Sequence, residues 1–113
     1  MLFFHNTAIL AGLLLLGKPV LASAVTPDEA EILVKTAAAG DAGALARLRQ
    51  AAERHDPESL YRLGTLVFEG RLVRKDLAQA AVLLKRAADK GHAAAQNAYG
   101  FMLQRHSRVR LEQ

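Results

Sequence analysis

The sequence repeats itself at a spacing of 36 residues, and this period limits the chain to architectures built from similar units. A displacement of 36 positions superposes the segment 51–54, AAER, on the segment 87–90, AADK. It also gives four further matches: Leu48 with Leu84, Asp56 with His92, Ser59 with Ala95, and Leu63-Gly64 with Tyr99-Gly100. One helical hairpin with its turns has about this length, which is typical of solenoid repeats.

Residues that begin and end helices divide the chain into five segments. Thr26-Pro27 and Asp56-Pro57 each place a capping side chain before a proline, and Asp76 precedes another helical pattern. Glu29, three residues after Thr26, completes a predicted capping box. Gly40, Gly70 and Gly91 follow apolar periodic runs, where a left-handed residue ends a helix. The predicted helices span residues 27–39, 42–54, 57–69, 77–90 and 93–105.

The connections and the composition favour an all-α fold. Only the 70–75 link is longer than a tight turn, so neighbouring helices are expected to be antiparallel hairpins. Alanine and leucine dominate and aromatic residues make up only 5%, which suits closely packed helices. No segment shows the alternation of a β-strand. We therefore predict a short α-solenoid of antiparallel hairpins, followed by a solvated tail over the basic segment 105–113.

Gly64 lies in the middle of a predicted helix, where glycine costs about 1 kcal/mol relative to alanine. Gly100 stands 36 residues later, in phase with it. The absent side chain allows two helix backbones to approach closely. The predicted partner is the alanine-rich stripe of helix 77–90, formed by Ala80, Leu84, Ala87 and Ala88.

From residue 56 to about 103 the chain resembles the Sel-one-like repeat, a relative of the tetratricopeptide repeat. The family pattern is L-G-x-x-Y-x-x-G-x-G-V-x-x-D-x-x-K-A, followed by aromatic residues and then A-A-x-x-G-x-x-x-A-Q. The matching residues are Leu63-Gly64, Gly70, Val73, Asp76, Ala80, Ala87-Ala88, Gly91, Ala95-Gln96 and Tyr99-Gly100. This chain departs from the pattern at Val67 for tyrosine, Leu72 for glycine, Gln79 for lysine, and Leu83-Leu84 for the aromatic residues. The resemblance implies a right-handed superhelix, with its best repeat at 56–91 and partial repeats at 27–55 and 92–106.

The N-terminal 24 residues have the layout of a cleavable signal peptide. An apolar run from Ala8 to Leu16 is followed by Ala22-Ser23-Ala24, a small-residue cleavage pattern. The run is shorter than the roughly 20 residues that span a bilayer. We expect cleavage after Ala24, a repeat domain over 25–113, and a periplasmic or secreted location. His5 stands where a signal usually carries a Lys or Arg.

The sequence contains no motif that predicts a catalytic, cofactor-binding or metal site. The chain has no cysteine, and His55, His92 and His106 show no metal-ligand spacing. Phosphate-binding and dinucleotide-binding glycine patterns are missing too. The formal charge is +4, from 15 Lys+Arg and 11 Asp+Glu, and the two signs alternate along most of the chain. This mixing disfavours nucleic acid as a partner.

The predicted function is therefore protein binding, without enzymatic activity. Hairpin solenoids bind through a concave surface formed by the first helix of each unit. The residues predicted to face a partner are Tyr61, Arg62, Thr65, Asn97 and Phe101. The family resemblance implies an adaptor or scaffold in the bacterial cell envelope.

Two alternatives stay open at the level of sequence. The first is an enzyme that acts on cell-wall material or β-lactams, although the chain has neither cysteine nor an S-x-x-K motif. The second is a self-assembling remnant of a longer array. The last predicted helix carries Tyr99, Phe101, Met102 and Leu103 with no helix predicted after it. We expect residues 93–110 to bind a partner or to form a homodimer.

Overall fold

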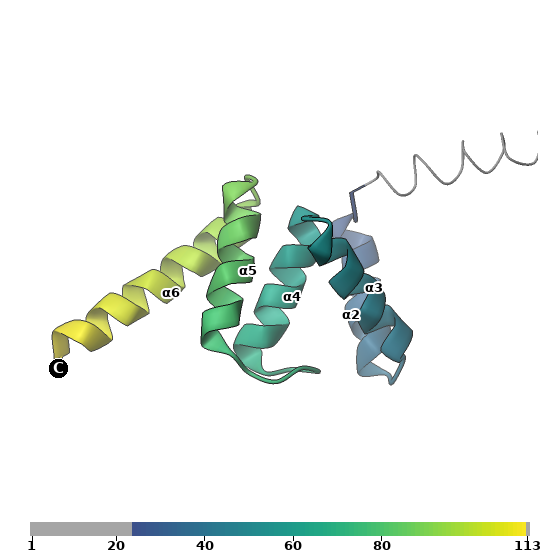
Figure 1. Ribbon diagram of the computed structural model, residues 1–113, viewed down its shortest axis with the longest axis horizontal. Coiled ribbons are helices and arrows are strands. Elements are labelled where there is room, and N and C mark those ends of the chain that lie inside the picture. The colour runs from purple at the N-terminus through teal and green to yellow at the C-terminus, as the bar shows by residue number, and fades with distance from the viewer. Residues whose placement is uncertain (1–23, 113) are drawn as a thin grey trace, which may run out of the picture.

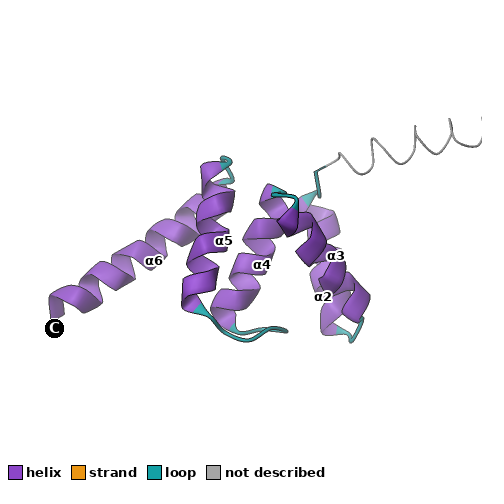
Figure 2. Ribbon diagram, viewed as in Figure 1, coloured by secondary structure: helices purple, strands orange, loops and turns teal. Residues whose placement is uncertain are grey.

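A computed structural model describes residues 24–112 of the chain as five α-helices, and no strand occurs in this range. Figure 1 shows their arrangement, and Figure 2 shows the short loops that join them. The helices are α2 (Pro27–Ala38), α3 (Ala42–Glu53), α4 (Pro57–Glu69), α5 (Leu77–Asp89) and α6 (Ala93–Glu112). The predicted all-α class is thus confirmed. Except for Ala24, the expected signal peptide lies outside the described residues.

The first four helices match the predicted spans to within one residue at each end, but the prediction for the last helix was wrong. Helix α6 does not end near residue 105; it continues to Glu112. The segment expected to be a solvated tail is therefore helical throughout its described part. It contains no glycine or proline, and its arginines, leucine and glutamate favour helix. Arg110 Nη2 lies 3.1 Å from His106 Nε2, one turn away.

Side chains of the predicted capping residues hold the helix starts. The Thr26 hydroxyl accepts a hydrogen bond from the Glu29 backbone N–H at 3.1 Å, and Asp76 accepts one from Gln79 N–H at 3.0 Å. Asp56 accepts hydrogen bonds from both the backbone N–H and the hydroxyl of Ser59, at 2.9 and 2.7 Å. The bonds from the backbone of Glu29, Ser59 and Gln79 each satisfy an N–H that has no partner within its own helix.

Left-handed residues end the helices, as expected from the glycines. Gly70 ends α4 with φ 71°, and Gly40 and Gly91 also have positive φ. After α3 this position is occupied by His55, with φ 64°, although the residue 36 positions later is Gly91. Leu72, in the α4–α5 link, has φ 63°. A side chain in this region is strained relative to glycine.

Each helix packs against its neighbours in the chain, and the contact between α4 and α5 is the most extensive. In Figure 1 these two helices run antiparallel at the centre, with α2 and α3 on one side and α6 leading away on the other. The main cluster of buried side chains comes from four helices, α3 to α6. Its members are Ala52, Leu60, Leu63, Val67, Ala80, Leu83, Ala87 and Ala95.

Gly64 lies at a close approach between α4 and α5. A Cβ on this residue would stand 2.9 Å from the Leu84 Cγ and 3.2 Å from the Leu83 Cβ. The predicted close packing is therefore present, with the two leucines as the nearest atoms. Gly100, its equivalent on α6, has nothing within 4 Å of the same Cβ position.

The period seen in the sequence reappears in the burial of side chains. The pairs Ala44 and Ala80, Leu48 and Leu84, Ala51 and Ala87, and Ser59 and Ala95 are all almost fully buried. Each pair is separated by 36 residues. The unit made of α3 and the start of α4 therefore buries the same positions as the unit made of α5 and the start of α6.

Candidate functional site

A polar cluster joins the start of α4 to the start of α6. The Glu58 carboxylate is only 10% exposed, and it contacts the side chains of Arg62 and His92. Its Oε1 accepts a hydrogen bond from Arg62 Nε at 2.9 Å, and its Oε2 lies 2.5 Å from His92 Nε2. The second contact spans 34 residues of sequence. It therefore fixes the orientation of one helix relative to another.

His92 also caps α6. Its Nδ1 lies 3.2 Å from the backbone N of Ala95 and accepts that hydrogen bond. A neutral imidazole has one donor and one acceptor nitrogen, so the proton belongs on Nε2 and points to Glu58. His92 thus stands where Asp56 stands in the preceding unit, and it performs the same capping role three residues before Ala95.

Three of the predicted partner-binding residues belong to this cluster or lie beside it. The Tyr61 ring stacks on the His92 ring, with centroids 4.6 Å apart and planes 24° apart. The Arg62 guanidinium lies 5.8 Å from the Tyr61 ring centre. Thr65 donates its hydroxyl hydrogen to the Tyr61 carbonyl oxygen at 2.9 Å. All three are half-buried, and Tyr61 packs against the core cluster, so they contribute to the fold.

The other two predicted residues are exposed on α6. Asn97 and Phe101 are one turn apart on this helix, and the Arg105 guanidinium lies 5.7 Å from the Phe101 ring centre. They are accessible to a partner without any change in the described structure. The predicted set is therefore divided between half-buried residues on α4 and accessible residues on α6.

The Glu58–His92 pair has contacts that suit a structural role. Both oxygens of Glu58 and both nitrogens of His92 have partners within the protein. Neither residue lines the cavity between α5 and α6 or the cavity formed by α3, α4, α5 and the α4–α5 link. Within residues 24–112 no group of three or more His, Asp or Glu side chains could hold a metal ion. The pair holds α4 and α6 together.

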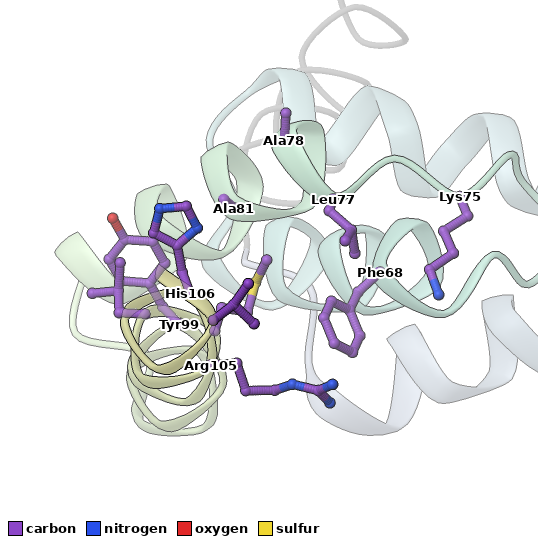
Figure 3. Close-up of a pocket in the computed structure, with 11 residues that line it drawn as sticks. Phe68, Lys75, Leu77, Ala78, Ala81, Tyr99, Arg105 and His106 are labelled. Carbon is purple, nitrogen blue, oxygen red and sulfur yellow. The ribbon is translucent and has the colours of Figure 1, made fainter. Parts of the chain in front are cut away.

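A groove opens farther along α6, where this helix leads away from α5. It has a volume of about 600 Å³ and is mainly apolar. From α6 it is lined by Tyr99, Met102, Leu103, Arg105, His106 and Val109, and from the rest of the chain by Phe68, Lys75, Leu77, Ala78 and Ala81. Figure 3 shows Phe68 and Leu77 side by side, with the Arg105 side chain extending beneath Phe68.

The two repeat units differ in exposure at one equivalent position beside this groove. Leu103 is the equivalent of Val67, 36 residues earlier. Val67 is 3% exposed in the core cluster around α4 and α5, whereas Leu103 is 50% exposed. Around α4, Val67 packs in the core cluster with residues of α5, whereas Leu103 lines the groove. We name the cavity with the eleven lining residues given above the α5–α6 groove.

Sequence reasoning missed both the Glu58–His92 contact and the groove. One signal for His92 was available, because the 36-residue displacement superposes it on the capping residue Asp56. No local pattern indicates that Glu58 meets it.

No described helix has both the length and the apolar character needed to cross a membrane. Comparison with protein-family models, with curated proteins and with solved structures found no match to this chain.

Proposed function

We propose that this protein is a short helical-repeat module that binds another protein, and that it serves as an adaptor or scaffold rather than as an enzyme. The observation that carries the proposal is the exposure of Leu103 in the α5–α6 groove, at a repeat position that is buried in the preceding unit. Apolar surface that collects in a groove is typical of an interaction site.

We further propose that the helices form a short right-handed solenoid of the Sel-one-like type. Three observations support this assignment. Burial repeats every 36 residues, and Gly64 lies at a close helix approach. Leu72 adopts a left-handed conformation at the position where the family pattern has glycine. Such modules act by binding, and the concave surface is one place where they do so.

The expected cellular location is part of the same proposal. Its basis is the signal-like layout of residues 1–24, which would direct the chain to the periplasm or the exterior. A partner is then expected among envelope or secreted proteins. A hydrolase of β-lactams remains the alternative, and purified protein with a chromogenic β-lactam tests it. We expect no turnover above buffer.

Affinity capture with matched variants tests the proposed function. Full-length protein with Leu103→Gln is compared with Phe101→Gln, because the two side chains are 50% and 52% exposed on the same helix. Asn97→Ala serves as a second probe of the surface predicted from sequence. These positions are better probes than Tyr61 or Arg62, whose replacement would also disturb the Glu58–His92 cluster.

A protein captured by the parent chain and lost in either Leu103→Gln or the Phe101 and Asn97 variants supports a binding module. The first result assigns binding to the groove and the second to the surface predicted from sequence. Capture that is unchanged in all three variants, or no capture from any envelope extract, would contradict the proposal.

A further inference from the structure

The α5–α6 groove has the dimensions of a site for a helix. Its α6 side is formed by the residues at positions 99, 102, 103, 105, 106 and 109, which lie on one continuous face of that helix. From Tyr99 to Val109 this face is about 15 Å long, or roughly three helical turns at 1.5 Å per residue. Apolar grooves of this kind accept the apolar face of an amphipathic helix.

The groove is also positively charged. Its lining includes Lys75 and Arg105, and it contains no aspartate or glutamate. Two acids lie near this lining along the chain: Asp76, which caps α5, and Glu69, which lies 3.7 Å from Arg71.

The segments that flank the groove strengthen the same sign of charge. Arg108 and Arg110 continue α6, against the single acid Glu112, and Arg74 precedes Lys75 in the α4–α5 link. A partner helix is therefore favoured if its polar face carries carboxylates.

The same charges disfavour a second copy of this chain as the occupant. Its most exposed apolar helix is α6, which would bring another Arg105, Arg108 and Arg110 to the cations of the groove. Like charges brought together at an interface oppose association. Homodimerisation through α6, expected from the sequence, stays a prediction that the experiment below tests.

We infer that the α5–α6 groove binds an acidic amphipathic helix of a partner protein. The apolar face of this helix would cover Phe68, Leu77 and Leu103, while its carboxylates would meet Lys75 and Arg105. The inference rests on the proposed function, since it names the class of partner that the binding module would take.

Fluorescence anisotropy with designed peptides tests this inference. Three labelled helix-forming peptides share one leucine face and carry glutamate, glutamine or lysine on the other face. Each is titrated with full-length protein and with four variants. The pair Arg105→Glu and Arg108→Glu tests charge, because only Arg105 lines the groove. The pair Leu103→Gln and Val82→Gln tests the apolar surface, because the two residues are 50% and 48% exposed and only Leu103 lines the groove.

The expected result is binding of the glutamate peptide about tenfold tighter than of the lysine peptide, with an affinity that falls as salt rises. Arg105→Glu and Leu103→Gln should each weaken it several-fold more than Arg108→Glu and Val82→Gln. Equal affinity for the three peptides would overturn the inference, as would equal effects within either pair. Self-association that depends on Leu103 would identify a second copy as the occupant and would also overturn it.

Binding to vesicles of phosphatidylglycerol tests whether the groove recognises an acidic membrane surface instead. Vesicle binding that depends on Arg105, without binding of the glutamate peptide, would assign the groove to an acidic membrane surface and overturn the inference. The inference can fail while the proposed function holds. In that case the affinity capture described above still yields a partner that is lost in Leu103→Gln or in the Phe101 and Asn97 variants, although the glutamate peptide is not preferred. Failure of the proposed function shows as no such capture and no peptide binding.

Discussion

Gly64 approaches Leu84 so closely that a Cβ on the glycine would stand 2.9 Å from the leucine Cγ. Leu84 is almost fully buried and cannot move away freely. The relationship explains a glycine inside α4 and sets the distance between the two central helices.

Replacing the two repeat-equivalent glycines with alanine should have opposite effects. Gly64→Ala should destabilise the protein, because overpacking of about 1–3 kcal/mol exceeds the gain of about 1 kcal/mol in helix propensity. Gly100→Ala meets nothing within 4 Å and should stabilise α6 by up to about 1 kcal/mol. Urea unfolding of both variants measures the difference. If both substitutions stabilise the protein, the close approach is wrong.

Glycine at the two left-handed positions should increase stability. His55 and Leu72 have φ values of 64° and 63°, where a side chain costs about 1–2 kcal/mol. Glycine removes this strain but has more freedom in the unfolded chain, so His55→Gly and Leu72→Gly should each stabilise by about 0.5–1 kcal/mol. Gly91→His is the reciprocal control and should destabilise. Thermal unfolding gives the sign, and a loss of stability in both glycine variants would be inconsistent with the observed turns.

The contact between Glu58 and His92 should produce measurable coupling. Removal of His92 by alanine loses the α6 cap, the Tyr61 stack and the Glu58 partner. His92→Asn restores a capping oxygen, so it should be less destabilising than His92→Ala by about 1 kcal/mol. A double-mutant cycle between Glu58→Gln and His92→Asn should give a coupling of about 0.5–3 kcal/mol. Additive effects would show that the two side chains do not interact in solution.

The backbone nitrogen of Val25 donates to Asp56 Oδ1 at 2.9 Å, across 31 residues. If the chain is cut after Ala24, as the sequence predicts, this nitrogen becomes a positively charged amino group beside a carboxylate. A chain that begins at Val25 should then be more stable with a free amine than with an acetylated one, by about 0.5–1 kcal/mol. Thermal unfolding at neutral pH provides the comparison.

Asp56→Asn is the control for this experiment, since asparagine still caps α4 but carries no charge. It should abolish the difference between the free and acetylated chains. A difference that persists in the Asn variant would mean that the charge acts elsewhere.

The part of the fold that follows from local chemistry could be predicted from the sequence. Thr26, Asp56 and Asp76 cap helices by side chains that act within one turn, and Gly70 ends α4 through its own conformation. Gly64 could be predicted as a packing position because its period identifies the facing helix. These features depend on few residues, all of them close in sequence or related by the repeat.

Features that depend on several helices at once escaped prediction. The sequence indicates Tyr61 only as a residue that faces a partner, whereas in the structure it also packs against the core cluster and stacks on His92. The groove depends on the direction in which α6 leads away from α5, and no short pattern specifies that direction. The helical continuation to Glu112 was missed because a charged segment was taken for a tail, although each of its residues is compatible with helix.

Photo-crosslinking in living cells tests the central claim most directly. A photoreactive residue is placed in turn at Leu103, inside the groove, and at Leu111, which is 86% exposed outside it. We predict a crosslinked product with a second, different protein at position 103, and little or none at position 111. Equal products at both positions, or none at position 103 under any growth condition, would contradict the assignment of the α5–α6 groove as the binding site.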